Sequence, residues 1–392
     1  MELFKKKKSF LGVDIGTASI KIVQVTHDGR KNILDTFGYV DVANDIIHDN
    51  TPESKDKLSK ALQQLKEKAR VSTTQAIAAL PTFAVFTSVI NLPKLHHKEL
   101  TSAINWEAKK YIPLPLEEMV LDWKIVGGDL DQVKREKVKG KGGLSLFKKK
   151  TPKASIVEGH SFKEGEFSSN KIISRPEENI RVLITAAPKT LVSKYLEIFR
   201  NAGLNLVSLE TEAFALSRSL LGDDNQLTMI VDIGSITTDI CVIENRIPVL
   251  NRSIDVGGLT ITKAITASLN VSQERAEQFK RDFGLVLGEA KKGIPKTIEA
   301  SLSPIINEIK YVFDLYRGQS SQGIEKILLA GGSSYLPNLP DYLLNLFNIP
   351  VYIGNPWTNL NYNDDLKPML DQIGTRMAVA VGLAMRDIEP KK

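Results

Sequence analysis

Residues 14–21 read DIGTASIK and residues 231–240 read VDIGSITTDI, two versions of the pattern that decides the fold. In each version an apolar run predicts a strand, and the acidic residue and glycine that follow predict a tight turn into a second strand. The matched pairs are Asp14 with Asp232, Gly16 with Gly234, Thr17 with Ser235, Ser19 with Thr237 and Lys21 with Asp239. Because the copies lie 218 residues apart, they favour two related halves that face each other across a cleft.

The chemistry of this pattern suits a phosphate clamp. Turn glycines let backbone N–H groups approach phosphate oxygens closely, and the hydroxyls add further donors. A carboxylate at each strand end, Asp14 and Asp232, can hold Mg²⁺ through waters, since this ion keeps much of its hydration shell. Lys21 in one copy and Asp239 in the other suit a site that holds both phosphate and metal. One hairpin alone is more typical of an ordinary structural turn, so the clamp interpretation depends on the second copy.

A glycine pair near residue 331 predicts a third wall of the same site. The stretch KILLAGGSS (326–334) predicts a strand followed by a turn at Gly331, Gly332 and Ser333, with a helix beginning around Pro337. The glycines would let the backbone lie against a nucleoside, and a helix start favours phosphate. Turns of this kind are common, so the motif supports the clamp without establishing it.

Two weaker motifs complete the set. DVGG at residues 255–258 offers a second flexible turn, at Gly257 and Gly258. ERAEQFKRDFG at residues 274–284 predicts a helix on which Glu277 and Lys280 share a face. A solvent-exposed ion pair is the usual explanation for that spacing.

Composition indicates a cytoplasmic protein with real cores. A chain of 392 residues with 42% hydrophobic residues should hold two or more domains. Its one cysteine, Cys241, excludes an intrachain disulfide, and its five histidines show no zinc-ligand spacing. We find no signal peptide and no stretch of 18 uninterrupted apolar residues.

The net charge of +6 belongs to one segment. Residues 127–176 hold 12 Lys and Arg against 6 Asp and Glu, so the rest of the chain is neutral. This segment is rich in Gly, Ser and Lys and predicts a flexible insertion. A solvated loop is the plain interpretation, and contact with anionic lipid or another acidic surface is the alternative. Without a recognised binding module, it does not predict nucleic-acid binding.

In combination, the motifs resemble the actin-like ATPase superfamily over nearly the whole chain. The resemblance implies an α/β fold of two duplicated, ribonuclease H-type halves with ATP and Mg²⁺ in the cleft between them. It implies a first phosphate element at Asp14, Gly16, Thr17, Ser19 and Lys21, and a second at Gly234, Ser235, Thr237 and Asp239. Asp232 would join Asp14 near the metal. The adenosine element would comprise Gly331, Gly332 and Ser333, with Glu277 and Lys280 reaching towards ribose or base and Gly257 and Gly258 lining the cofactor site.

The region between the two hairpins narrows the family. AINWEAKKYIPLPLEEMVLDWKIV (103–126), VLITAAPKTLVSKYLEIFRNAGL (182–204) and ETEAFALSRSL (210–220) are similar to the PilM family of type IV pilus assembly and, more distantly, to FtsA. The resemblance implies a small α+β subdomain inserted in the first half, and an ATP-binding scaffold beside the inner membrane. It implies that the cytoplasmic N-terminal tail of PilN binds beside this subdomain, with PilO and a pilus motor ATPase as further partners and with membrane contact made through those partners.

The same patterns set the expected boundaries. We expect a first half at 1–75, 202–224 and 372–387, an inserted subdomain at 76–201, and a second half at 225–355. The PilN groove is expected between the insert and the first half, near residues 91–95 and the helix from Ile104 to Tyr111. On that helix Leu100, Ile104, Ala108 and Tyr111 form one apolar stripe.

Two alternatives stay open at this point. A small-molecule kinase of the same superfamily needs a positioned general base, for which only Asp239 is a candidate. An FtsA-like division protein is expected to finish with a linker and an amphipathic membrane helix, whereas residues 377–392 show neither. Turnover of ATP and self-association are left open by these residues.

Overall fold

The computed structural model describes residues 8–28, 31–43, 46–47, 49–95, 97–112, 114–127, 179–285, 293–318, 320 and 322–386. The basic segment therefore lies outside the described residues, apart from Gly127. Across the described part of the chain, no helix combines the length and apolar character that a membrane span requires.

The first sheet has five strands in the order β3-β2-β1-β4-β8. They are β1 (Lys8–Ile15), β2 (Ser19–His27), β3 (Asn32–Asp41), β4 (Gln75–Leu80) and β8 (Asn205–Thr211). β1, β2 and β3 form antiparallel hairpins, whereas β4 and β8 are added in parallel and need the crossover helices α1 (Pro52–Lys68) and α3 (Lys189–Asn201). The Thr51 hydroxyl accepts the Ser54 N–H to start α1, and Leu58 and Leu62 bury its inner face against this sheet.

The second sheet repeats this arrangement strand for strand. Its order is β11-β10-β9-β12-β13. The strands are β9 (Thr228–Ile233), β10 (Thr238–Glu244), β11 (Ile247–Ile254), β12 (Lys326–Ala330) and β13 (Val351–Ile353). The helices α5 (Gly258–Leu269), α6 (Gln273–Phe283), α7 (Ile294–Arg317) and α8 (Leu339–Phe347) belong to this half. Two sheets with one strand order, each opening on a matched hairpin, confirm the duplicated actin-like fold that the sequence predicted.

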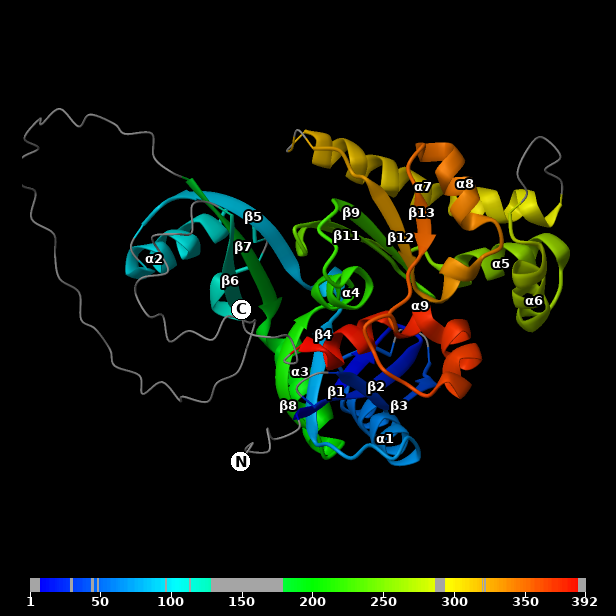
Figure 1. Ribbon diagram of the computed structural model, residues 1–392, viewed down its shortest axis with the longest axis horizontal. Coiled ribbons are helices and arrows are strands. Elements are labelled where there is room, and N and C mark those ends of the chain that lie inside the picture. The colour runs from blue at the N-terminus through cyan, green and yellow to red at the C-terminus, as the bar shows by residue number, and fades with distance from the viewer. Residues whose placement is uncertain are drawn as a thin grey trace, which may run out of the picture.

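Two helices lie between the sheets. α4 (Glu212–Leu221) and α9 (Lys367–Ala384) share a buried apolar cluster with strand residues from both halves (Figure 1). α9 also covers β2, because Met377 and Val381 bury against Val23 and Val25. The closing helix expected at 372–387 therefore packs with the first half and begins five residues earlier, at Lys367.

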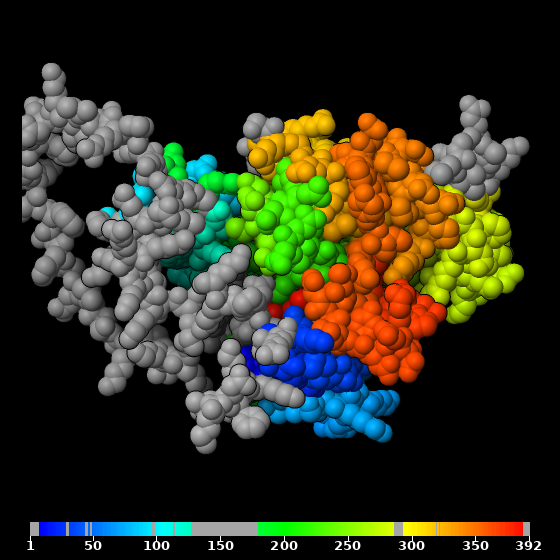
Figure 2. All heavy atoms as spheres, in the orientation of Figure 1, coloured from blue at the N-terminus to red at the C-terminus, as the bar shows by residue number. Residues whose placement is uncertain are grey.

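The inserted subdomain is a small sheet with one helix. Its strands are β5 (Phe86–Pro93), β6 (Met119–Gly127) and β7 (Asn179–Pro188), in the order β5-β7-β6, and its helix is α2 (His97–Ala108). Ile90, Ile104 and Val182 belong to a core that this subdomain keeps to itself. It lies to one side of the two halves in the ribbon view (Figure 1), and only part of it shows in the space-filling view (Figure 2).

The structure assigns both ends of the insert expected at 76–201 to the first half, because β4 belongs to its sheet and α3 to its core. β4 pairs with β1 and β8, so residues 75–80 belong to the sheet of the first half. α3 buries Tyr195 and Phe199 in the core of the first half. The insert therefore runs from about residue 81, directly after β4, to Pro188, the last residue of β7 before α3 begins.

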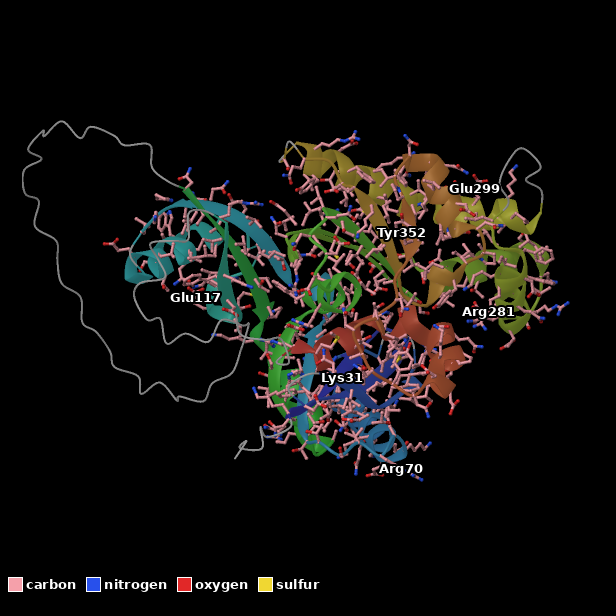
Figure 3. All side chains as sticks on the ribbon, viewed as in Figure 1. Lys31, Arg70, Glu117, Arg281, Glu299 and Tyr352 are labelled. Atoms are coloured by element: carbon pink, nitrogen blue, oxygen red, sulfur yellow. The ribbon has the colours of Figure 1, made fainter. Side chains whose placement is uncertain are left out.

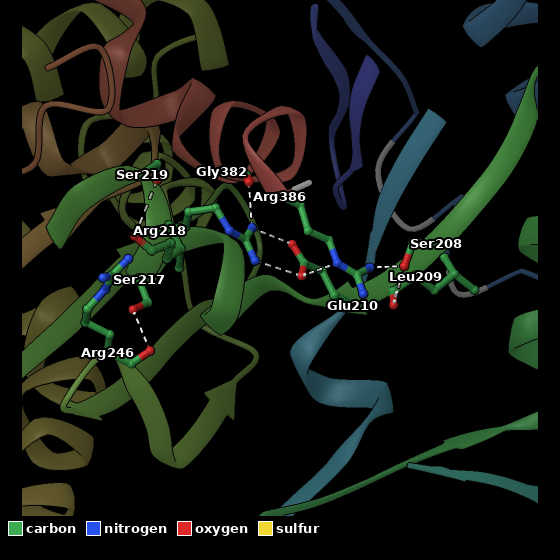
Figure 4. Close-up of polar contacts among 10 residues, drawn as sticks. Ser208, Leu209, Glu210, Ser217, Arg218, Ser219, Arg246, Gly382 and Arg386 are labelled. Carbon is green, nitrogen blue, oxygen red and sulfur yellow. Dashed lines mark hydrogen bonds and ion pairs between the residues drawn. The ribbon is translucent and has the colours of Figure 1, made fainter. Parts of the chain in front are cut away.

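A buried charge network joins α4, α9 and β8. The Arg218 guanidinium donates to Glu210 at 2.8 and 3.1 Å and also to the carbonyl of Gly382 (Figure 4). Arg386 pairs with the same carboxylate at 3.5 Å and donates to the Ser208 hydroxyl. Since the Glu210 side chain is only 3% exposed, its charge needs both arginines, and the network fixes the end of α9 against the first sheet.

Candidate functional site

A cleft of about 1150 Å³ opens between the two halves. Its walls include the following residues predicted for the site: Asp14, Gly16, Thr17, Ser19, Lys21, Asp232, Gly234, Ser235, Thr237, Asp239, Gly258, Glu277, Lys280, Gly331, Gly332 and Ser333. The exception is Gly257, which lies one residue behind the wall at the start of α5. The fold thus brings residues far apart in sequence to one cavity, as the repeated hairpin implied. Their individual roles stay predictions.

The two hairpins, called here the first jaw (Asp14–Lys21) and the second jaw (Asp232–Asp239), share the same turn geometry. Gly16 N donates to the Ser19 carbonyl at 3.0 Å, and Gly234 N donates to the Thr237 carbonyl at 2.9 Å. Next to each turn, two residues of the hairpin face each other across the paired strands. Asp14 lies opposite Lys21 in the first hairpin, and Asp232 lies opposite Asp239 in the second. In the first pair the Lys21 ammonium binds the Asp14 carboxylate at 2.8 Å. The second pair is two acids, so the second jaw has negative charge that its own strands do not neutralise.

Burial makes these acids hard to ionise. Burial, and after it the charge of Asp239, raise the pKa of Asp232 to about 7. Burial, with the charge of Asp14 adding to it, raises the pKa of Asp239 to about 6. A cation between the jaws would lower both pKa values, since an opposite charge favours the ionised form.

One buried acid of the cleft, Glu212, was missed at the sequence level. Glu212 begins α4 and accepts the N–H of Thr82 at 2.9 Å and its hydroxyl at 2.7 Å. Burial, followed by the charges of Asp239 and Asp14, raises the pKa of Glu212 well above its ordinary value. The available signal was its place directly after β8, since Asp14 and Asp232 also lie at the ends of strands. A carboxyl group with a raised pKa keeps its proton to higher pH, which suits it to donate or accept a proton near neutral pH.

The glycine turn after β12 touches the second jaw. Gly331 has φ +80°, and a Cβ atom there would lie 2.4 Å from a carboxylate oxygen of Asp232 and 2.3 Å from the Ile233 carbonyl. Ser333 donates to the Gly234 carbonyl at 3.4 Å. A short 3-10 turn (Gly332–Tyr335) follows the glycines, and α8 begins only at Leu339, so the helix start lies two residues beyond the expected position.

Glu277 and Lys280 form a partly buried cluster and not a surface pair. Their side chains are 2.7 Å apart, and the ammonium also donates to the Thr262 hydroxyl at 3.0 Å and to the Gly258 carbonyl at 3.2 Å. Burial lowers the pKa of Lys280. For Glu277 burial acts in the raising direction, but hydrogen bonds from Lys280 and Thr262 lower the pKa overall. Arg281, one position further on in α6, pairs with Glu277 at 3.3 Å and also lines the cleft (Figure 3).

The remaining wall comes from α9 and β3 and was not predicted. The Arg376 guanidinium lies 4.2 Å from the centre of the Tyr39 ring and pairs with Asp41. Tyr39 stands opposite Lys21 in the register of β2 and β3, so this group borders the first jaw. The Tyr335 hydroxyl donates to the Asp371 carbonyl at 2.5 Å, which ties the glycine turn of the second half to α9.

The donor set fits a hydrated magnesium ion. In the described part of the chain, no three His, Cys, Asp or Glu side chains converge to hold a metal alone. Mg²⁺ binds in sites of this kind through one or two carboxylates, waters and substrate phosphates. One carboxylate oxygen of Asp239 is buried without a hydrogen-bond partner, and Asp232 faces it across the same strand pair. Asp232 and Asp239 would hold the hydrated ion; the sequence pattern assigned Asp14 to it together with Asp232, and in the structure Lys21 engages Asp14 at 2.8 Å.

With the cleft and the insert described, comparison with known proteins identifies the family. A family profile described as "Type IV pilus assembly protein PilM" matches residues 12–138 and 167–388. The chain belongs to the PilM family. It is therefore an actin-like protein of type IV pilus assembly.

Solved structures and curated sequences agree with this placement. A structure described as a PilM-PilN type IV pilus biogenesis complex aligns with a TM-score of 0.75 and 25% identity, over 97% of this chain and 98% of that chain. The ethanolamine utilization protein EutJ of Carboxydothermus hydrogenoformans shares the fold, with a TM-score of 0.51 and 16% identity over 97% of this chain and 90% of that one. The cell division protein FtsA of Enterococcus hirae is 23% identical over 386 residues, which cover 89% of this chain and 79% of FtsA.

The structure places the residues predicted to line the PilN groove differently from what the sequence pattern suggested. Leu100, Ile104 and Ala108 face the core of the insert, so they offer no outer surface. α2 ends at Ala108, which leaves Tyr111 outside the helix and 48% exposed. Residues 91–95 lie at the far end of the insert, because β5 leaves the first half at Phe86 and pairs its last residue with Asn179.

Apolar side chains are nevertheless exposed at the other end of α2. Trp106 is 70% exposed, and Tyr111 and Leu114 are 48% and 46% exposed. The chain then enters β6 at Met119, which pairs with Pro188 next to the first half. The exposed apolar residues thus follow the part of the insert that leads back to the first half.

Proposed function

We propose that this protein binds Mg·ATP in the cleft and holds the cytoplasmic N-terminal tail of a PilN protein on its inserted subdomain. The observation that carries the nucleotide part is the matched pair of hairpins that face each other across one cleft, with Lys21 on one jaw and unpaired acids on the other. Backbone N–H groups and hydroxyls of the two turns would bind phosphate, and Asp232 and Asp239 would hold the hydrated metal.

The PilN part is supported by the aligned PilM-PilN complex and by the exposed apolar surface on the insert. A short tail is flexible when free, so its binding must offset the entropy of ordering. Trp106, Tyr111 and Leu114 offer apolar area for its aliphatic side chains at little entropic cost. In this proposal PilN holds the protein at the cytoplasmic face of the inner membrane, in a complex with PilO, and a pilus motor ATPase is a further candidate partner.

Nucleotide binding is tested by calorimetric titration of Mg·ATP into wild-type protein and two variants. Lys21→Ala and Asp232→Ala each remove one charge-assisted contact, worth about 1.5–3 kcal/mol, so we expect affinity to fall about ten- to a hundredfold. Arg252→Ala serves as the control, because Arg252 pairs with Glu308 on the surface away from the cleft. Equal affinities for all four proteins would place the nucleotide elsewhere.

Tail binding is tested by fluorescence anisotropy with a labelled peptide of the cognate PilN N-terminus. Trp106→Ala removes the most exposed of the three apolar side chains, and we expect at least a tenfold loss of affinity. Tyr352→Ala is the matched control, since Tyr352 is 54% exposed on the edge strand of the second half, remote from the insert (Figure 3). Absence of peptide binding by the wild-type protein, with and without ATP, would remove the scaffold assignment.

A further inference from the structure

The inserted subdomain is held from two sides. On the first half, the Lys189 ammonium at the start of α3 donates to the Glu117 carbonyl, and Val85, Val120 and Ala187 pack at the edge of the core. On the second half, Arg181 of β7 makes a two-pronged ion pair with Glu244, with both N–O distances at 2.9 Å. The subdomain thus spans the two bodies whose separation defines the cleft.

Glu244 is joined to the cleft by a single strand. It ends β10, and Asp239 lies at the other end of this strand, in the cleft wall. β10 is hydrogen-bonded to β9 on one side and β11 on the other, so it is an interior strand of the second sheet. Packed strands of this kind move as units, so a displacement at Asp239 reaches Glu244.

The turn that follows Glu244 is held in an unusual conformation. Asn245 and Arg246 have φ values of +50° and +67°, a region that a residue such as arginine seldom occupies. The Arg246 carbonyl accepts the Ser217 hydroxyl of α4 at 3.1 Å (Figure 4), and its guanidinium pairs with Asp223 at 3.2 Å. The helix between the sheets, the second half and the insert therefore meet within three consecutive residues.

We propose that the Arg181–Glu244 ion pair couples the nucleotide cleft to the inserted subdomain, so that Mg·ATP and the PilN tail change one another's affinity. This inference rests on the proposed function. When the two halves close on a nucleotide, they move relative to each other. The subdomain contacts both halves, so either its packing on the first half or its ion pair with the second half must then change. The open and closed cleft therefore go with different positions of the subdomain. A tail peptide that binds one position more tightly shifts the equilibrium between the open and closed cleft.

The experiment measures the affinity of the full-length protein for a PilN tail peptide with Mg·ATP and without nucleotide. The ratio of the two affinities reports the coupling, which is typically about 5–150-fold in allosteric proteins. We expect Arg181→Glu and Glu244→Arg each to bring the ratio close to one. The double charge exchange should restore it, because the ion pair re-forms with its charges reversed.

Arg252→Ala is the matched control. Arg252 is 45% exposed and pairs with Glu308 at 2.8 Å within the second half, whereas Arg181 is 39% exposed and its pair crosses to another subdomain. The control should keep the wild-type ratio. Single variants that also keep it, or a double exchange that fails to restore it, would overturn the proposal.

A second readout does not need the tail. Amide hydrogen exchange in β5 and β7 of the wild-type protein should change on addition of Mg·ATP, and this response should be lost in Arg181→Glu. A protein that fails to bind the tail but shows the exchange response would refute the PilN assignment. The coupling between the cleft and the inserted subdomain would stand. A protein that binds both ligands with a ratio of one and no exchange response would retain the proposed function and refute the coupling. Direct titration showing no nucleotide binding would refute both.

Discussion

At the scale of single residues, the cleft is dominated by acids that burial keeps partly protonated. Asp232 and Asp239 face each other across one strand pair, and burial, followed by the charges of Asp239 and Asp14, raises the pKa of Glu212. Lys21 is committed to Asp14.

Asp232→Asn should stabilise the metal-free protein at pH 8. The folded-state pKa of Asp232 is about 7, above its ordinary value of 3.8, so the folded state binds more protons and wild-type stability falls as pH rises from about 4 to 7. Asparagine has no charge to bury, so the variant escapes this loss, which is on the order of 2–4 kcal/mol. Thermal melts at pH 5, 6, 7 and 8 without Mg²⁺ test this, and a variant no more stable than wild type at pH 8 would contradict it. With Mg²⁺ and ATP, the wild type should gain more stability than the variant, because its affinity for the nucleotide is higher.

Gly331→Ala should disrupt the second jaw. Its φ of +80° and ψ of +164° lie in a region that is open essentially to glycine alone, and the new methyl group would meet the Ile233 carbonyl at 2.3 Å. We expect a loss of about 1–3 kcal/mol of unfolding free energy together with weaker nucleotide binding. Gly332→Ala is the control, since no atom lies within 4 Å of the position its Cβ would take. Equal denaturant midpoints for the two variants would show that the turn relaxes freely.

At the scale of elements, α4 and α9 determine how closely the two sheets approach. A Cβ on Gly382 of α9 would lie 1.9 Å from the Ala215 carbonyl of α4, and a Cβ on Gly12 of β1 would lie 2.0 Å from the Ala380 carbonyl of α9. The backbones are therefore in direct contact in the centre of the molecule.

Gly382→Ala should destabilise the protein although it lies within a helix. Alanine in place of glycine normally stabilises a helix by up to about 1 kcal/mol. Here the clash with α4 is larger, so we expect a net loss of about 2 kcal/mol or more. Chemical denaturation measures the difference. Gly318→Ala at the end of α7, where a Cβ would have ordinary contacts at 3.5 Å, should be close to neutral, and the same result for Gly382 would mean that α4 and α9 can separate without cost.

At the scale of the whole molecule, residues 128–170 can be removed without taking away any residue that the structure describes. Gly127 and Arg181 are paired across β6 and β7, so a short turn can join these two strands. Their removal also takes away most of the excess positive charge, because the rest of the chain is neutral.

Replacing residues 128–170 with a short turn should leave the affinity for the PilN tail unchanged and weaken binding to anionic vesicles. The positive charges would otherwise lie near the anionic inner leaflet and contribute about 1 kcal/mol each close to the surface. Anisotropy with the tail peptide and co-sedimentation with vesicles of phosphatidylglycerol and phosphatidylcholine measure the two effects. Vesicles of phosphatidylcholine alone are the control. Loss of tail binding on deletion would assign the segment to the PilN contact.

The sequence by itself determined the duplicated fold and most of the cleft. Each jaw is a local hairpin whose glycine, hydroxyl and acid positions are set by the geometry of its own turn, and the same pattern appears twice. Tertiary packing decided the rest. Glu212 reaches the cleft because α4 packs between the sheets, and α3 joins the first half because Tyr195 and Phe199 bury there. Arg181 meets Glu244 across 63 residues, since the insert folds back onto the second half. Contacts of this kind depend on how whole elements are placed, so no local pattern of residues carries them.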